Sequence, residues 1–69
     1  MTAEAVRNLL HATPFIPFVI HVPDLAPVQV PHPDFAHVFP NGKTMVFYGE
    51  GGKNFRILDV ALITQLELS

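Results

Sequence analysis

Two of the four histidines flank an aspartate in the stretch PHPDFAH at positions 31–37. Imidazole and carboxylate groups are zinc ligands, and three of them plus a water form the usual catalytic zinc site. His32, Asp34 and His37 are therefore candidate metal ligands, with His21 as a fourth candidate. The two prolines of the stretch favour a turn that would break this arrangement, and no ligand motif such as His-Glu-x-x-His is present. We predict turn chemistry, with Asp34 capping a short helical turn, and no bound metal or other cofactor.

The sequence offers no constellation that supports catalysis. Acid–base chemistry needs two titratable groups held close together with separated pKa values, and no spacing pairs the histidines with the carboxylates. The chain has no cysteine, and its single serine is the terminal Ser69. The run GEGGK at positions 49–53 could suggest a phosphate-binding loop, but Asn54 and a strand pattern follow it instead of Ser or Thr and a helix. We predict that the protein is not an enzyme.

Composition favours a small domain that binds protein. Hydrophobic residues make up 49% of the 69 residues and charged residues 14%. A chain this short has too little interior to bury that many apolar side chains, so part of the apolar surface is expected to face a partner. The net charge is −2, with only four Lys and Arg residues, which is a poor supply of cations for phosphate neutralisation.

No segment approaches the roughly 18 consecutive apolar residues of a membrane span. The N-terminus also lacks the basic start and long apolar core of a signal peptide. We therefore expect a cytoplasmic protein that forms a homo-oligomer or binds a protein partner, with no membrane and no nucleic acid as the default partner.

One helix and a series of short strands must position these residues. Thr2 as N-cap and the helical spacing of Val6, Leu9 and Leu10 predict a helix over about 2–12. From about position 17 the pattern changes to period two, and the Asn-Gly pair between apolar runs is typical of a hairpin turn with positive φ. The predicted strands lie at about 17–22, 28–30, 36–39, 44–48, 55–58 and 63–68.

This order predicts one α+β domain over residues 1–69. In it, an N-terminal helix is followed by a strongly bent antiparallel five- to six-strand meander over about 17–68. The element order is similar to that of SH3-like or Sm-like small barrels, a resemblance at the level of fold that does not carry function.

Several runs also resemble a group of short uncharacterised bacterial proteins that are abundant in planctomycete-type genomes. These runs are PFIPFVIHV, VPHPDF, NGKTMVFY and FRILDVALITQLEL, and they cover most of the chain. In that group the first hairpin usually carries an Asp-Gly type turn, whereas this chain reads PDLAP. The group has no established activity, so the resemblance implies no functional residues.

The last predicted strand is the favoured partner surface because little charge protects it from pairing with another chain. Alternation would place two sets of side chains on opposite faces: Leu62, Thr64, Leu66 and Leu68 on one, and Ile63, Gln65 and Glu67 on the other. The residues assigned to partner binding are Ile63, Thr64, Gln65, Leu66 and Leu68. We predict a non-catalytic interaction module that self-associates or docks on a protein partner through this edge strand. The alternative is that the strand pairs internally and closes the barrel, which would give a monomer.

A second functional alternative is an Sm-like nucleic-acid-binding barrel. Single-strand binding combines aromatic platforms with a basic groove. Phe39 and Tyr48 would supply stacking, and Lys43 and Lys53 would supply charge. Against this, aromatic residues at alternating positions are more typical of a core, and we expect five of the six phenylalanines to be buried there.

Overall fold

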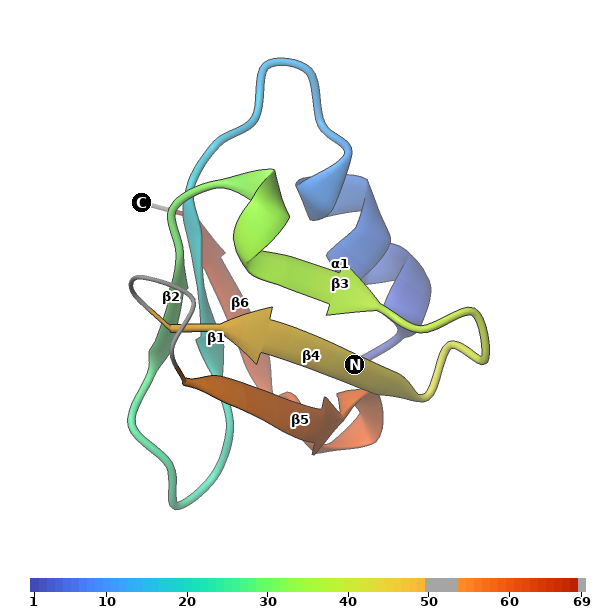
Figure 1. Ribbon diagram of the computed structural model, residues 1–69, viewed down its shortest axis with the longest axis vertical. Coiled ribbons are helices and arrows are strands. Elements are labelled where there is room, and N and C mark those ends of the chain that lie inside the picture. Colours follow the sequence, from blue (N-terminus) through green and yellow to red (C-terminus); the bar gives the residue numbers. More distant parts are fainter. Residues whose placement is uncertain (50–53, 69) are drawn as a thin grey trace.

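The protein has an α+β fold with one α-helix and six antiparallel strands in the part that the computed structural model describes, residues 1–49 and 54–68 (Figure 1). Two short 3-10 turns, η1 (Pro33–Phe35) and η3 (Val60–Leu62), precede the third and sixth strands. The longer elements are α1 (Ala3–Leu10), β1 (Phe18–His21), β2 (Val28–Val30), β3 (Ala36–Val38), β4 (Thr44–Tyr48), β5 (Phe55–Asp59) and β6 (Gln65–Leu68). The predicted elements are all present, with the helix shorter at both ends than the predicted span of about 2–12.

Helix α1 begins where the sequence predicts. The Thr2 side chain accepts a hydrogen bond from the Ala5 N–H at 3.3 Å, which satisfies one of the free donors of the first turn. Val6 and Leu10 lie one turn apart and are both buried. An eight-residue helix is not stable alone, so this packing holds it. No described helix is both long enough and apolar enough to cross a membrane.

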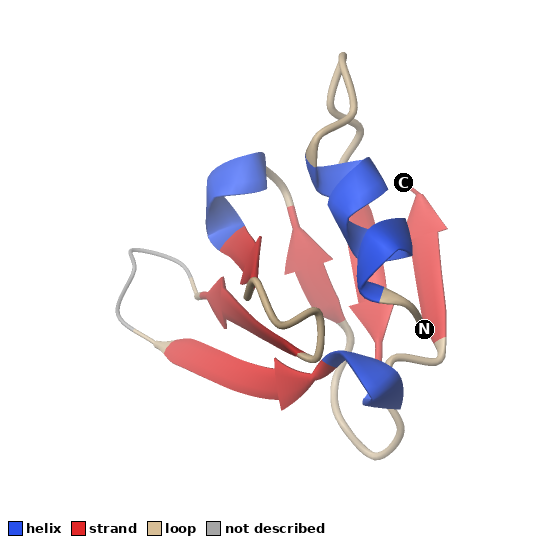
Figure 2. Ribbon diagram, turned by 90° about the vertical axis from the view of Figure 1, so that its right-hand side faces the viewer, coloured by secondary structure: helices blue, strands red, loops and turns tan. Residues whose placement is uncertain are grey.

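The strands form two three-stranded sheets (Figure 2). In the first sheet the order is β2-β1-β6, and in the second it is β3-β4-β5. The last strand leaves the sequential order and pairs with the first, with Ile20 opposite Leu66 and Phe18 opposite Leu68. The central strands are therefore β1 and β4, and β6 lies at an edge of the first sheet.

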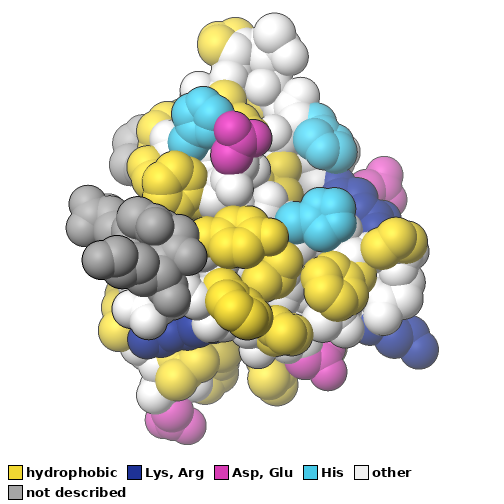
Figure 3. Space-filling model, in the orientation of Figure 1, with side chains coloured by type: hydrophobic (Ala, Val, Ile, Leu, Met, Phe, Trp, Pro, Cys, Tyr) yellow, Lys and Arg dark blue, Asp and Glu magenta, His cyan; other side chains and the backbone are white. Residues whose placement is uncertain are grey.

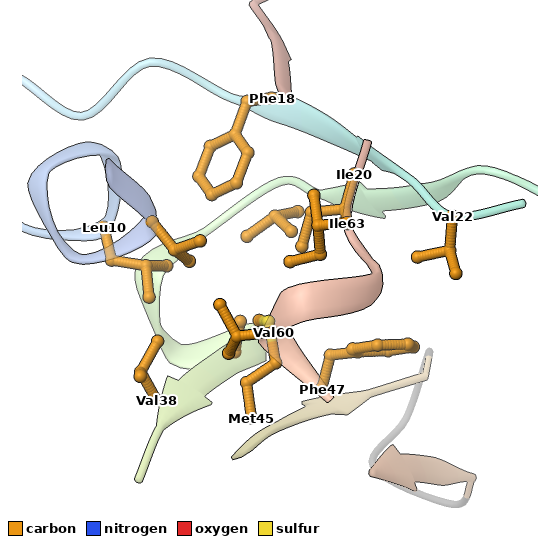
Figure 4. Close-up of a cluster of buried hydrophobic side chains, with 12 residues drawn as sticks. Leu10, Phe18, Ile20, Val22, Val38, Met45, Phe47, Val60 and Ile63 are labelled. Atoms are coloured by element: carbon orange, nitrogen blue, oxygen red, sulfur yellow. The ribbon is translucent and has the colours of Figure 1, made fainter. Parts of the chain in front are cut away.

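The hydrophobic core lies between the two sheets and α1. Phe18 and Ile20 of β1 and Met45 and Phe47 of β4 point toward one another from opposite layers (Figure 4). Val60 of η3 joins them. Two of the six phenylalanines, Phe18 and Phe47, are buried in this core, fewer than the five predicted, and Phe15 and Phe35 pack against it partly buried.

The β3–β4 connection is the tight turn that the Asn-Gly pair predicts. Gly42 has a φ of 70°, and its N–H donates to the Phe39 carbonyl at 3.0 Å. The Asn41 side-chain oxygen accepts from the N–H groups of Lys43 and Thr44. The turn therefore needs one residue with positive φ, and glycine occupies that position.

The entry into β6 contains a β-bulge that the predicted alternation did not include. The Thr64 N–H donates to the His21 carbonyl at 2.9 Å, while the ladder pairs His21 with Gln65, so two residues of one strand face one residue of the other. The extra residue shifts the alternation by one position. Ile63 consequently points into the core and is only 2% exposed (Figure 4), so it does not share the face of Gln65 and Glu67, where the predicted alternation placed it.

Candidate functional site

The histidine-aspartate stretch at positions 31–37 forms a capped turn. His32 is the N-cap of η1, and its Nδ1 accepts a hydrogen bond from the Asp34 N–H at 3.2 Å. The Asp34 carboxylate lies 3.5 Å from the same nitrogen and is largely exposed. The predicted turn is therefore present, but the capping side chain is His32 and not Asp34.

The other histidines of the proposed ligand set lie in separate strands. His37 is in β3, where its ring centroid is 6.0 Å from that of Phe39. His21 is in β1, and its Nε2 lies 2.9 Å from a carboxylate oxygen of Glu67 in β6. Across residues 1–49 and 54–68, no three His, Asp or Glu side chains gather closely enough to hold a metal ion.

The β6 residues assigned to a partner surface fall into three environments. Ile63 is core, and Thr64 uses both its N–H and its hydroxyl on the His21 carbonyl. Leu66 is half-buried on the core side. Gln65 is exposed, and Leu68 is 54% exposed at the end of the strand. The described strands include no partner for β6 on the side away from β1, so its backbone edge there is open for pairing.

The described members of the nucleic-acid set are not grouped together. Lys43 precedes β4 and Tyr48 ends it, so their backbones are roughly 16 Å apart along an extended strand. Phe39 is half-buried just after β3, and its carbonyl accepts a hydrogen bond from the Arg7 guanidinium at 2.8 Å. Lys53 lies outside the described residues.

Strand β5 directs two of its three apolar residues, Phe55 and Ile57, away from the core, while Leu58 packs against the core. Ile57 is paired with Val46, and Arg56 is paired with Phe47. Since directly paired residues point to the same side of a sheet, Arg56 shares the face of the buried Phe47. Phe55 and Ile57 lie on the opposite face and are 63% and 61% exposed.

These residues create an apolar surface, which we call the apolar outer face: Val46, Tyr48, Phe55 and Ile57. Tyr48 is paired directly with Phe55, so the four side chains are contiguous across β4 and β5. Figure 3 shows hydrophobic side chains gathered over the position of β3, β4 and β5 in Figure 1. Val46 is only 7% exposed because its neighbours on both sides, His37 and Ile57, cover it on the central strand.

The outer face of the first sheet has a different character. Its outward residues are mainly polar, with His21 and Glu67 in contact and Gln29 and Gln65 exposed. The two sheets are thus unequal, and among the described strands only the second sheet presents large, well-exposed apolar side chains on its outer face. The alternation of β5 is visible in the sequence, but alternation alone does not say which of the two sets faces the core.

A groove of about 520 Å³ opens between β2 and the paired ends of β4 and β5. Apolar side chains of both sheets, including Val28, Phe35 and Phe47, line it. Its other lining residues are Ala26, Pro27, Gln29, Pro31, Tyr48, Gly49, Asn54 and Arg56. Arg56 is the only charged residue among the described residues that line it.

No family model, curated protein or solved structure matches this chain. The resemblance to the group of bacterial proteins stays a prediction.

Proposed function

We propose that this domain is a non-catalytic interaction module that self-associates or docks on a protein partner. The observation that carries the proposal is the apolar outer face, where Phe55 and Ile57 are each more than 60% exposed beside Tyr48 and Val46. A register one residue different would have buried Phe55 and Ile57. A surface role accounts for apolar side chains in these positions.

The size of this face suits the centre of an interface. Aromatic side chains bury about 150–250 Å² each, so the exposed fractions of Tyr48, Phe55 and Ile57 correspond to roughly 300 Å² of apolar surface. The largest apolar patch on a typical monomer is about this size and is often functional. A stable interface buries about 800 Å² per partner, so the surrounding polar residues would have to contribute the rest.

The open edge of β6 is a second route to association, and it is the one that the sequence favours. Edge strands present unpaired backbone groups that can pair with another chain. The one charged residue in β6, Glu67, contacts His21 on the outer face of the same sheet. Pairing of two β6 strands about a two-fold axis would extend the first sheet across both protomers.

The use of the titratable side chains supports a role without catalysis. His21 contacts Glu67 across two strands, and His32 caps a turn beside Asp34. Both pairs are at the surface. These structural uses of the four residues support a non-catalytic module. The location that we propose for it, the cytoplasm, is the one expected from the sequence.

Size-exclusion chromatography with light scattering, over a range of concentrations, tests the proposal. We expect the protein to elute as a dimer or larger species, and Ile57→Lys to shift it to monomer with an unchanged circular dichroism spectrum. Leu25→Lys is the matched control because Leu25 is 51% exposed in the β1–β2 turn. Leu68→Lys on the β6 edge distinguishes the two routes, since it should dissociate only a β6-paired oligomer.

A protein that stays monomeric at every concentration would reject self-association. The alternative function, an SH3-like or Sm-like barrel that binds nucleic acid through Phe39, Lys43, Tyr48 and Lys53, predicts a different response. Binding to a single-stranded oligonucleotide would weaken steeply with added salt, whereas apolar self-association would not.

A further inference from the structure

We propose that the groove between β2 and the β4–β5 hairpin binds a small organic carboxylate with a flat apolar body, and that Arg56 recognises the carboxylate. Arg56 and Phe55 point to opposite sides of β5, so the site lies on the other side of this strand from Phe55 and Ile57, and Tyr48 is the residue that it shares with the apolar outer face. The inference therefore does not depend on self-association.

The position of Arg56 is the first observation behind this assignment. Arg56 is paired with Phe47, so it stands on the sheet face that elsewhere supplies core residues. Its guanidinium forms no ion pair or hydrogen bond with any described side chain, and it lines the groove. A cation at a core-facing strand position breaks the local pattern, and such conflicts are expected at functional sites.

The lining of the groove has the composition of a small-molecule site. Its volume of about 520 Å³ falls within the usual range of roughly 300–1,000 Å³. Phe47, Phe35 and Val28 give it apolar walls. The polar residues among the described lining are few: Gln29, Tyr48, Asn54 and Arg56. This combination of apolar walls and a few polar groups fixes the orientation of a ligand.

The rim at the β4–β5 end is held close by the backbone. The Gly49 N–H donates to the Asn54 carbonyl. A Cβ built on Gly49 would lie 2.9 Å from that oxygen, closer than real side chains approach. Only glycine fits this contact, which brings the ends of the two strands together beside Arg56.

Charge favours a single carboxylate as the ligand head group. The guanidinium has a planar fork of donors that matches a carboxylate with two parallel hydrogen bonds. One cation suits one negative charge, whereas a phosphate would need further donors or cations that the described lining does not supply. The apolar walls then suit an aromatic or short aliphatic body.

A peptide strand is the less suitable occupant. Extended peptides bind by adding a strand to a sheet edge. Two edge strands contribute to this groove, β5 with Arg56 alone and β2 with Val28 and Gln29, so β2 is the main edge beside it. That strand has three residues and is flanked by Pro27 and Pro31. Prolines lack the N–H donor and short strands offer few backbone groups, so this edge is poorly suited to pairing.

The test is a ¹H–¹⁵N NMR titration with 3-phenylpropionate and, separately, with its neutral amide, 3-phenylpropionamide. We expect saturable shifts in the backbone N–H groups of Gln29, Gly49 and Asn54, which line the groove, with a millimolar Kd for a fragment of this size. The amide should bind at least tenfold more weakly. Arg56→Gln should weaken carboxylate binding to a similar extent. Lys43→Gln is the matched control, since it removes one positive charge at an exposed position outside the groove and should leave the Kd unchanged.

Three results would overturn the proposal. Equal affinity for the carboxylate and the amide would show that Arg56 does not recognise the negative charge of the ligand, and this comparison needs no variant. Shifts that map outside the groove, or no saturable shifts, would remove the site. Shifts along Val28–Val30 with an acidic peptide, but none with 3-phenylpropionate, would make the occupant a peptide.

Discussion

Thr64 donates both its backbone N–H and its hydroxyl to the carbonyl oxygen of His21, at 2.9 and 3.2 Å. The ladder nevertheless pairs His21 with Gln65. This bulge lets Ile63 enter the core three residues before Leu66, which packs on the same side. A regular strand could not place both residues inward, because side chains an odd number of positions apart point to opposite faces.

Replacing Ile63 tests whether its side chain is buried in the core, as the bulge places it. Ile63→Ala should lower the free energy of unfolding by about 2–4 kcal/mol, because it removes a buried side chain and leaves a cavity. Leu62→Ala is the matched control, since Leu62 is 56% exposed in the preceding turn, and it should cost less than about 1 kcal/mol. Urea denaturation monitored by circular dichroism measures both. Equal costs for the two variants would mean that Ile63 does not belong to the core.

The β3–β4 turn should respond to backbone conformation alone. Gly42→Ala should destabilise the protein by about 1 kcal/mol, because L-residues with a side chain disfavour its φ of 70°. A Cβ at this position would meet only the Ala3 Cβ at an ordinary 3.6 Å, so crowding adds nothing. Gly42→Asn should recover part of the loss, since asparagine tolerates positive φ. Thermal unfolding of the wild-type protein and both variants measures this. A melting temperature of Gly42→Ala equal to that of the wild type would contradict the prediction.

The hydrogen bond from helix α1 to the end of β3 should contribute measurably. The Arg7 guanidinium donates to the Phe39 carbonyl at 2.8 Å in a partly buried position. Arg7→Ala should cost about 1–3 kcal/mol, as expected for loss of a hydrogen bond from a charged donor. Asn8→Ala, at the exposed neighbouring position, should cost far less. Chemical denaturation provides the comparison, and a similar cost for the two would leave Arg7 no role in docking the helix.

The His21–Glu67 contact should matter little for stability. Both side chains are substantially exposed, and exposed ion pairs contribute about 0–1 kcal/mol. Glu67→Gln should therefore change the free energy of unfolding by less than about 1 kcal/mol. A larger loss in a urea titration would show that this pair organises β1 and β6 beyond its exposed charges.

Local features of the fold follow from short sequence signals. Thr2 starts the helix as a capping residue should, and Gly42 takes the one positive φ that the β3–β4 turn needs. Strand positions follow from period-two patterns bounded by turns. Each of these features depends on neighbours within a few residues, which is why the sequence alone predicts them.

Other features depend on contacts between distant residues. The pairing of β6 with β1 joins segments more than 40 residues apart, and nothing local specifies it. Alternation in β5 gives two sets, Phe55 with Ile57 and Arg56 with Leu58, but the register with β4 decides which set faces inward. The use of His32 as the cap in place of Asp34 is a local contact, but it depends on side-chain geometry in the turn that the residue types do not specify. The groove beside Arg56 could not be predicted because two sheets form it.

The unequal outer faces of the two sheets make the whole domain amphiphilic. One side carries Gln29, Gln65 and the His21–Glu67 contact, and the other carries Phe55, Ile57 and Tyr48. Such a body takes a preferred orientation at any boundary between water and an apolar phase. On a hydrophobic interaction resin it would adsorb by the second sheet and leave the first sheet accessible to solvent.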